Sequence, residues 1–277
     1  MSKARNIDLS IVTVTMNSMG TIKALLHSLF EEATRDVRAE IIIVDNCSTD
    51  GTRDFIRTYF PSVTLIENTE IKGFAENNNR GIGASRGEFV ALINPDVVVL
   101  PQSLKQLLGF MMSNKSVGIV APKLCNADRS LQDSARRFVN LRTVFLRFFY
   151  WGTKENDSRE LRNYLMVDAD LSAVQPVDWV IGAVMIVRKA AFENIGLLDE
   201  KYFLYIEDQD LCYRMWKEGW SVFYYPEAVM LHNHQRKSVK GGLSRLAVIH
   251  AKSLLYFLWK HRILFSSSRP CSKPSPQ

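Results

Sequence analysis

Short apolar, β-branched runs alternate with amphipathic segments over the first 112 residues of the chain. The apolar runs predict strands, and the segments between them follow the helical period of 3.6 residues. The predicted strands are residues 9–15, 40–44, 63–67 and 89–93, and the predicted helices are 21–30, 52–59, 74–85 and 101–112. Strands that alternate with helices form β-α-β units, in which helices cover both faces of a parallel sheet. The alternation therefore predicts the α/β class with a mainly parallel central sheet.

Polar residues directly follow three of the predicted strands. Ligands bind beyond the carboxyl ends of parallel strands, so these residues should share one edge of the sheet. They are Thr15 and Asn17, Asp45, and the pair Asn94 and Asp96. Alternatively, such residues only cap turns and helices, which is the reading we favour for residues 48–50. For Asp45 and Asp96, each directly behind an apolar strand, we expect a ligand role.

Three acidic residues begin a predicted helix in the second half of the chain. This half is predicted to contain a long strand at 177–187, the helix at 206–218, strands near 222–225 and 229–231, and a long helix at 243–265. Capping of the helix dipole accounts for one of the acids Glu207, Asp208 and Asp210, but hardly for all three. Crowded carboxylates raise each other's pKa, so near a metal and a diphosphate one of them could act as a general base.

Two further residues could contact a cation. The Asp96 carboxylate suits Mg²⁺, which commonly uses one or two protein carboxylates together with substrate phosphates. His232 follows the apolar run 229–231, and His234 would lie on the same face of any continued strand. We favour a metal or phosphate contact for His232 and an ordinary surface position for His234.

Basic residues are concentrated towards the C-terminal end. The chain has 35 Lys and Arg against 29 Asp and Glu, a net charge of +6. Residues 228–277 contain nine basic and no acidic residues, so the first 227 residues carry a net charge of −3. A second acid-free stretch, residues 136–151, combines aromatic residues with Arg136, Arg137, Arg142 and Arg147. Both stretches suit an anionic partner such as a membrane or nucleic acid, and the alternatives are a solvated tail, core packing or a dimer contact.

Several classes of protein are disfavoured by features that the sequence lacks. No apolar run approaches the roughly 20 residues that span a bilayer, and the start has no signal-peptide core. The four cysteines are far apart and form no CxxC pair, which favours a reducing compartment and no structural zinc. The sequence has no P-loop and no HExxH motif, and its glycines at 81–87 do not fit a dinucleotide fingerprint. We therefore expect a cytosolic protein.

Taken in order, the motifs resemble the family 2 glycosyltransferases, in particular their bacterial rhamnosyltransferase-like branch. The resemblance covers residues 10–232 and depends on several ordered motifs, each of which would be weak alone. The matching segments are SIVTVTMNS, IIIVDNCSTDGT, KGFAENNNRGIG, ALINPDVVV and VDWVIGAVMIVRKAAFENIGLLDEKYFLYIEDQDLCYRMWKEGW, followed by the strand before His232. The resemblance implies a GT-A fold, a nucleotide-diphosphate sugar donor, a divalent cation (Mg²⁺ or Mn²⁺) and inversion at the anomeric carbon.

By position, the resemblance also implies which residues bind the donor. The nucleotide-binding residues would be Thr15, Asn17 and Asp45, with Asn79 lining the donor pocket and with Trp179 and Gly182 shaping the sugar pocket. Met16 stands where an aromatic residue is usual, so the nucleotide base would stack differently.

The resemblance implies the reacting groups in the same way. Asp96 is the retained carboxylate of the family's Asp-x-Asp element and would meet the metal and the diphosphate, whereas Asn94 replaces the first acid. Asp208, in the Glu207-Asp208 pair, would be the catalytic base. His232 would add a metal or diphosphate contact.

Together these assignments predict an inverting, metal-dependent glycosyltransferase in cell-surface polysaccharide synthesis, such as that of O-antigen. The expected donor is dTDP-L-rhamnose, and the expected acceptor is a polyprenyl-diphosphate-linked saccharide. The alternatives are a UDP-hexose or UDP-N-acetylhexosamine donor, or a nucleotide-sugar-binding protein without transferase activity. Nucleic-acid binding is disfavoured by the acidic balance of the first 227 residues.

The predicted organisation has three parts. Residues 1–235 form the GT-A domain, with an acceptor- or membrane-facing insert at about 129–170. Residues 236–265 form a basic amphipathic helix, and residues 266–277 form a disordered tail. The basic and aromatic stretches predict peripheral binding to the anionic cytoplasmic face of the inner membrane, and a homodimer is a further expectation.

Overall fold

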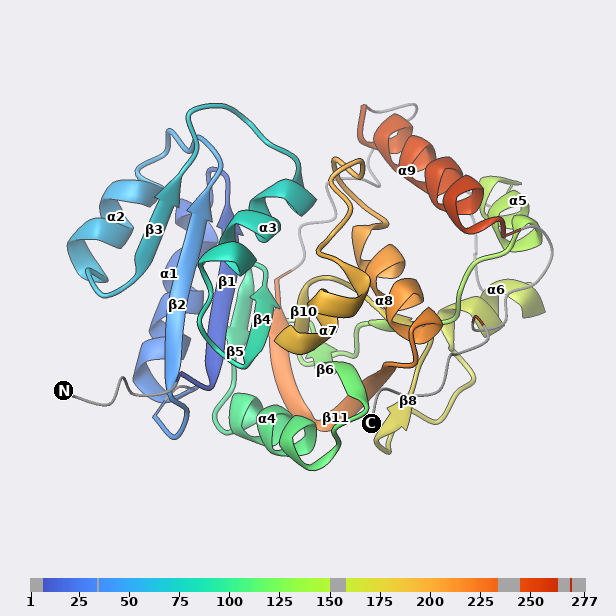
Figure 1. The fold of residues 1–277 in the computed structure, drawn as a ribbon, viewed down its shortest axis with the longest axis horizontal. Helices are drawn as coiled ribbons and strands as arrows, with labels where there is room; N and C mark the ends of the chain where they lie inside the picture. Colours follow the sequence, from blue (N-terminus) through green and yellow to red (C-terminus); the bar gives the residue numbers. More distant parts are fainter. Residues whose placement is uncertain (1–6, 34, 150–157, 234–244, 264–269, 271–277) are drawn as a thin grey trace.

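A mixed β-sheet with helices on both faces forms the centre of the molecule (Figure 1). The computed structural model describes residues 7–33, 35–149, 158–233, 245–263 and 270. The first half of the sheet is parallel, as the alternation of strands and helices predicts. Its strands lie in the order β3 (Thr64–Glu67), β2 (Ala39–Asp45), β1 (Leu9–Thr15) and β4 (Phe89–Ile93).

The second half of the sheet mixes strand directions. Strand β10 (Val184–Arg188) is antiparallel to both of its neighbours, β4 and β6 (Val117–Cys125). The long strand β11 (Ser221–His232) runs parallel to β6. Two short strands, β5 (Val97–Val99) and β8 (Gln175–Pro176), pair antiparallel with β11, and a separate small sheet joins β7 (Ala135–Arg136) to β9 (Trp179–Val180).

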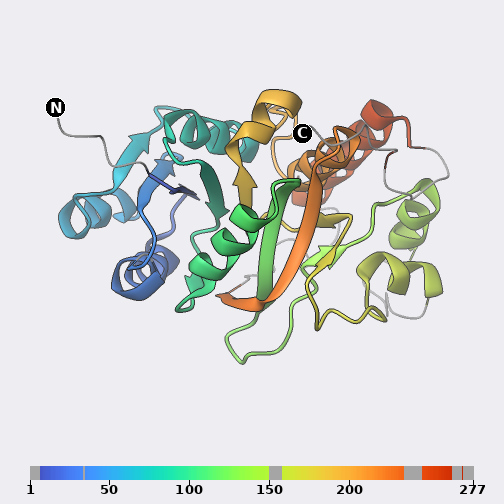
Figure 2. The same cartoon turned by 60° about the horizontal axis from the view of Figure 1, so that its bottom comes forward.

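Strand β4 shows why the sheet is buried on both faces. Side chains alternate along a strand, so Phe89, Ala91 and Ile93 belong to one hydrophobic core and Val90 and Leu92 to the other. The first core is closed by α1 (Met19–Ser28) and α4 (Ser103–Ser113), and the second by α3 (Phe74–Ala84), α7 (Lys189–Ile195) and α8 (Glu207–Lys217). Figure 2 shows α1 and α4 on the opposite side of the sheet from α3 and α7.

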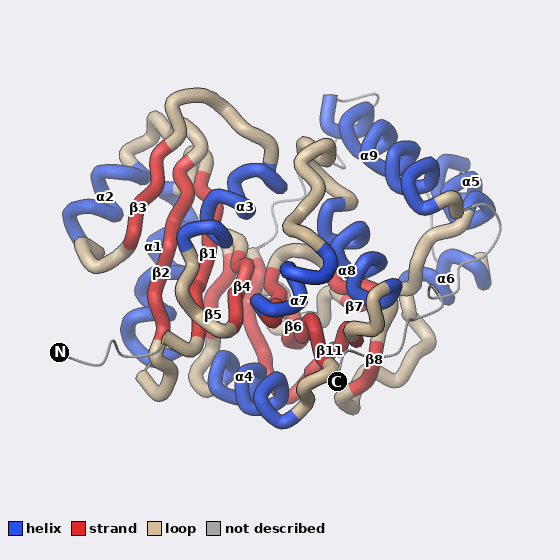
Figure 3. Tube along the Cα trace, viewed as in Figure 1, coloured by secondary structure: helices blue, strands red, loops and turns tan. Residues whose placement is uncertain are grey.

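The remaining helices lie around this centre (Figure 3). They are α2 (Thr52–Tyr59), α5 (Leu141–Phe149), α6 (Arg159–Leu165) and α9 (Arg245–His261). Helix α9 is part of the core that includes α8, because its Phe257 and Leu258 are buried there. None of the helices in the described part of the chain has the length and hydropathy needed to cross a bilayer.

Three expectations about the second half are corrected by the structure. The predicted strand at 177–187 is two strands, β9 and β10, because the chain turns at 181–183 between them. The strands near 222–225 and 229–231 are the single strand β11, which has an irregularity beside Pro226, where a ladder hydrogen bond is impossible. Strand β6 was not predicted, although it lies inside the sheet.

Other boundaries differ less. Helix α9 ends at His261, whereas the sequence predicts a helix to residue 265. Elements β7, α5 and α6 lie within the predicted insert at 129–170. The three-part domain organisation stays a prediction, and the predicted disordered tail lies outside the described residues except for Pro270.

Candidate active site

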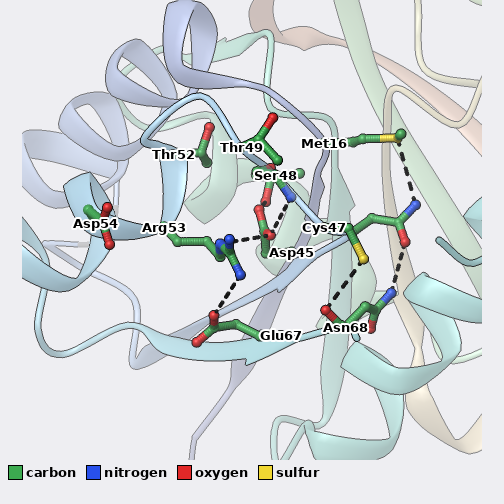
Figure 4. Close-up of polar contacts among 12 residues, drawn as sticks. Met16, Asp45, Cys47, Ser48, Thr49, Thr52, Arg53, Asp54, Glu67 and Asn68 are labelled. Atoms are coloured by element: carbon green, nitrogen blue, oxygen red, sulfur yellow. Dashed lines mark hydrogen bonds and ion pairs between the residues drawn. The ribbon is translucent and has the colours of Figure 1, made fainter. Parts of the chain in front are cut away.

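The carboxyl ends of β1 and β2 are joined by buried hydrogen bonds. Thr15 and Asp45 are register partners, and the Thr15 hydroxyl donates to Asp45 Oδ2 at 2.9 Å. The other carboxylate oxygen, Oδ1, accepts the Ser48 N–H at 2.9 Å and lies 3.7 Å from Arg53 Nε. Figure 4 shows Arg53 between Asp45 and Glu67. The fully buried Asp45 therefore holds β1 to the loop that follows β2.

Asn17 closes the same loop from the β1 side. It has a φ of 51°, its N–H donates to Ser48 Oγ at 2.8 Å, and its Oδ1 accepts the Thr49 N–H at 2.8 Å. The turn role expected for residues 48–50 is confirmed, since Asp50 also accepts the N–H groups of Met19 and Thr52. The nucleotide contacts expected for Thr15, Asn17 and Asp45 stay predictions.

An asparagine network beside this loop was not recognised in the sequence. Asn68 Nδ2 donates to Asn46 Oδ1 at 2.9 Å and to Asn77 Oδ1 at 2.6 Å. Asn46 also bonds both backbone groups of Lys72, and its Nδ2 lies 3.9 Å from the sulfur of the half-exposed Met16. The only signal was the polar run 77–79 in a helix that packs on the sheet.

Asn79 holds the segment that leads to the acidic cluster. Its Oδ1 accepts the Leu198 N–H at 3.0 Å, and its Nδ2 donates to the Leu198 carbonyl and to Glu200 Oε1, both at 2.9 Å. All of the hydrogen-bonding groups of this amide are therefore used within the protein. The expected lining of a donor pocket by Asn79 stays a prediction.

Asp96 and His232 meet where β5 pairs with the end of β11. His232 Nε2 lies 3.4 Å from Asp96 Oδ1, an oxygen that accepts no hydrogen bond from any described residue. His232 Nδ1 bonds to Gln132 Oε1 at 2.9 Å, and because an amide oxygen only accepts, Nδ1 carries a proton. The other ring nitrogen, Nε2, faces the Asp96 carboxylate.

The 3.4 Å separation of His232 Nε2 and Asp96 Oδ1 suits an ion pair with a protonated imidazole, and it also suits two ligands of one cation. Imidazole nitrogen and carboxylate oxygen suit Mn²⁺, and Mg²⁺ also uses few protein ligands beside substrate phosphates. No cluster of three or more His, Cys, Asp or Glu side chains that could hold a metal alone occurs in the described residues. The site thus fits a cation that is completed by a substrate.

Asp208 lies in the first turn of α8 and is bonded to the turn between β9 and β10. Its Oδ2 accepts the Gly182 N–H at 2.8 Å, and its Oδ1 accepts the N–H of Gln209 at 2.7 Å. The next carbonyl, that of Ala183, accepts the Asn94 N–H at 2.9 Å. The Gly182-Ala183 turn therefore links Asp208 to the strand end that carries Asp96.

Glu207 and Asp208 share an environment that favours protonation. Burial raises the pKa of Asp208, while the hydrogen bonds from Gly182 and Gln209 and the charge of Arg136 act in the opposite direction. Burial raises the pKa of Glu207 well above its usual range, and the neighbouring charges of Asp208 and Asp210 raise it further. Asp208 accepts two backbone N–H groups, which favour its ionised form, whereas Glu207 Oε2 accepts no hydrogen bond from the described residues.

Three of the four arginines of the acid-free stretch have described side chains, and their surroundings differ. Arg136 pairs with Trp179 between β7 and β9, and its guanidinium lies 5.9 Å from the Trp179 ring and 5.7 Å from the Tyr164 ring. Arg137 pairs with Asp178 at 3.3 Å. Arg142 is exposed on α5, whereas the side chain of Arg147, on the same helix, lies outside the described residues. Of this set, Arg136 is the residue whose charge acts on Asp208.

Trp179 is buried beside this arginine. Its Nε1 donates to the Arg137 carbonyl at 2.7 Å, so the indole is fixed at the edge of the small sheet. Gly182 is closely packed, because an added Cβ would lie 3.3 Å from Asp208 Cβ. The sugar-pocket roles of both residues stay predictions.

Known protein families and sequences support the resemblance to the family 2 glycosyltransferases. The sequence profile described as "Glycosyl transferase family 2" matches residues 10–175, more than half of the chain. The chain is 28% identical over 267 residues to N-acetylglucosaminyl-diphospho-decaprenol L-rhamnosyltransferase of Mycobacterium tuberculosis, covering 91% of this chain and 85% of that protein. It is 25% identical over 264 residues to rhamnosyltransferase WbbL of Escherichia coli, covering 92% and 94% of the two chains.

Solved structures share the fold at low sequence identity. GalNAc-T7 with UDP, GalNAc and Mn²⁺ superposes with a TM-score of 0.68 at 14% identity, over 92% of this chain and 49% of that one. The mannosyltransferase PcManGT of Pyrobaculum calidifontis, in complex with GDP-Man and Mn²⁺, has a TM-score of 0.65 at 17% identity, over 96% and 67% of the two chains. The expected GT-A fold is confirmed.

The buried Glu207 leads to a prediction about stability. Its pKa is raised in the folded state, so the folded protein binds more protons than the unfolded chain above about pH 4.5, and stability falls as pH rises. Glu207→Gln removes this loss. We therefore expect the free energy of unfolding of Glu207→Gln to exceed that of the wild type by more at pH 8 than at pH 5. Urea denaturation at the two pH values measures the difference.

The matched control is Glu193→Gln, which changes an exposed carboxylate on α7. Its effect on the free energy of unfolding should be the same at both pH values. An equally pH-independent effect of Glu207→Gln would contradict the raised pKa of Glu207.

Proposed function

Because the chain belongs to glycosyl transferase family 2, we propose that it transfers a sugar from a nucleoside diphosphate donor to a lipid-linked saccharide, with inversion at the anomeric carbon. One observation carries the proposal. Asp208, a partly buried carboxylate, is bonded to the same turn that bonds the strand end carrying Asp96. This link supports a role for Asp208 as base and for Asp96 in binding the diphosphate at one site.

Asp208 acts as the general base in this proposal. Its carboxylate accepts the proton of an acceptor hydroxyl, whose oxygen forms a bond to the anomeric carbon while the bond from that carbon to the diphosphate oxygen breaks. Attack occurs opposite the leaving group, so one displacement inverts the configuration. The N–H groups of Gly182 and Gln209, which donate to Asp208, favour its ionised form.

Asp96 and His232 would hold the divalent cation together with the donor diphosphate. A bound Mg²⁺ or Mn²⁺ would neutralise negative charge that develops on the departing diphosphate. The 3.4 Å approach of His232 Nε2 to Asp96 Oδ1 supports this assignment, because imidazole nitrogen and carboxylate oxygen are both metal ligands. Asn94 offers an amide in place of a second carboxylate, so fewer protein charges bind the cation.

We also propose a specific donor sugar and a specific class of acceptor. We take dTDP-L-rhamnose as the donor, supported by two relatives whose names describe rhamnosyltransferases. We take a polyprenyl-diphosphate-linked saccharide as the acceptor, supported by the name of the mycobacterial relative. Arg136, which lies over two aromatic rings and acts electrostatically on Asp208, supplies positive charge where such an acceptor would enter.

The outer face of α9 supports peripheral attachment to an anionic bilayer. Val248, Leu255 and Trp259 recur at helical spacing, and Leu255 and Trp259 are 64% and 74% exposed. Arg245 and Lys252 are exposed on the same helix, which has no acidic residue. Exposed apolar and basic side chains together suit the boundary between headgroups and acyl chains. We place this attachment at the cytoplasmic face of the inner membrane, and a homodimer stays a prediction.

Substitution of the base tests the proposed chemistry. Asp208→Asn keeps the size of the side chain but removes its capacity to accept a proton, so kcat for transfer should fall about 10²- to 10⁴-fold. The measurement is transfer to a lipid-linked acceptor in detergent, with Asp54→Asn on the surface of α2 as the control. Full activity of Asp208→Asn, or retention of the donor's anomeric configuration in the product by NMR, would contradict the mechanism.

A screen of nucleotide sugars tests the donor and the cation. We expect release of nucleotide from dTDP-rhamnose to be faster than from UDP-hexoses or UDP-N-acetylhexosamines, and to require Mg²⁺ or Mn²⁺. Asp96→Asn should weaken binding of Mn²⁺ with dTDP, measured by calorimetry, because it removes the carboxylate beside His232. Preference for a UDP-sugar would change the donor, and full activity in a chelator would exclude the cation.

Flotation with vesicles tests the membrane surface. Leu255→Ser combined with Trp259→Ser should lower the fraction bound to anionic vesicles by about tenfold or more, because two exposed apolar side chains no longer enter the interface. The matched control is Tyr59→Ser, which removes an exposed aromatic side chain from α2. Unchanged flotation of the double variant would show that this face does not bind membrane.

A further inference from the structure

Asp210, the third carboxylate in the first turn of α8, has a different environment from Asp208. Asp210 is fully buried, and its Oδ2 accepts Arg214 Nε at 2.7 Å from the same helix. Its Oδ1 lies 2.7 Å from Lys260 Nζ and 2.8 Å from His261 Nε2, both on α9. The Tyr202 hydroxyl donates to the same oxygen at 3.2 Å. These charges and hydrogen bonds outweigh burial and hold the pKa of Asp210 below its usual range.

Helix α9 also holds the start of segment 199–210, which leads into α8 and includes its first turn. Asp199 Oδ2 accepts Lys260 Nζ at 2.7 Å and the Tyr256 hydroxyl at 3.0 Å. In the middle of the segment, the Ser253 hydroxyl donates to the Leu204 carbonyl at 3.0 Å. One face of α9 therefore contacts residues 199–210 at their beginning, middle and end, and Lys260 bridges the two terminal carboxylates.

This segment needs to be held because its backbone is strained. Tyr205 and Ile206 have φ values of 68° and 71°, a region that β-branched and bulky residues seldom adopt. Residues 199–210 contain no glycine that could absorb the bend. Such conformations persist only where the surrounding structure enforces them, and they are common at functional sites. Asp208 lies two residues after Ile206, so this strained backbone leads into the turn that carries Asp208.

We propose that Lys260, assisted by Tyr256 and His261, is a positioning residue for the catalytic base. It fixes both ends of segment 199–210, and this keeps Asp208 on the Gly182 N–H and aimed at the acceptor hydroxyl. Without the ammonium, Asp199 and Asp210 would lose the one cation that they share. Arg214 still pairs with Asp210, but nothing would join the two ends of the segment through their carboxylates, and the repulsion between them would open it. The inference rests on the proposed role of Asp208 as the base.

Lys260→Met tests this role, because methionine retains the apolar stem and removes the charge. Misplacement of a base by a fraction of an ångström slows the chemical step, so kcat should fall roughly 10- to 100-fold. The KM for the nucleotide donor should stay close to the wild-type value. Asn79, proposed to line the donor pocket, contacts the segment at Glu200, but both backbone groups of Leu198, outside the segment, also hold it. Lys260→Arg can still bridge two carboxylates and should recover most of kcat.

The control is Lys217→Met, which removes an exposed charge from the other end of α8 and should leave kcat unchanged. All variants are assayed as full-length protein with acceptor in detergent, below the melting temperature of each variant. If Lys260→Met does not fold, Tyr256→Phe is tested in its place. This variant deletes one hydroxyl bonded to Asp199 and should lower kcat a few-fold without changing the donor KM.

The outcomes separate this inference from the proposed function. Loss of kcat at constant donor KM, restored by arginine, supports a positioning role. Wild-type kcat in folded Lys260→Met, or a loss that Lys260→Arg does not restore, overturns it, even where Asp208→Asn is inactive. Full activity of Asp208→Asn instead overturns the assignment of the base itself.

Discussion

The hydrogen bond from the Gly182 N–H to Asp208 is the contact on which the arrangement of the site depends. It requires a turn at residues 181–183, and this turn divides what would otherwise be one strand into β9 and β10. The division lets β10 enter the sheet between β4 and β6 while β9 joins the small sheet with Arg136. Glycine suits position 182 because a Cβ there would lie only 3.3 Å from Asp208 Cβ. One turn thus sets the sheet order, the place of Arg136 and the orientation of the base.

The parts of the site that could be predicted are those built from local patterns. Apolar strands followed by polar residues placed Thr15, Asp45 and Asp96 at strand ends, and the pairing of Thr15 with Asp45 confirms the shared edge for these two. Strand β6 could not be recognised in the same way, because its apolar run includes Gly118, Pro122 and Lys123. The antiparallel insertion of β10 was equally hidden, since a strand's direction depends on partners distant in the sequence.

The distinction between Asp208 and Asp210 lies beyond any local pattern. Both residues are acids in the first turn of one helix, and either could cap it or act as a base. The structure separates them through partners far along the chain: Gly182 for one, and Lys260 and His261 for the other. Partners 26 to 51 residues away are not encoded in the spacing of the acids. The different surroundings of the two carboxylates therefore follow from tertiary contacts, which bond Asp208 to a backbone turn and pair Asp210 with cations inside the protein.

The same reasoning changes the meaning of the basic C-terminal segment. Its charges read in the sequence as one surface, but Lys260 points inward to Asp199 and Asp210 while Arg245 and Lys252 are exposed. Charge that neutralises buried carboxylates is not available to attract a bilayer, so the net charge overstates the charge that faces an anionic surface. Helix α9 carries both sets of residues. Those that hold segment 199–210 lie on one face, and the exposed Leu255 and Trp259 lie on the other. Deletion of the whole helix would remove both faces at once. Only substitutions confined to one face can therefore separate the proposed membrane attachment from the proposed positioning of Asp208.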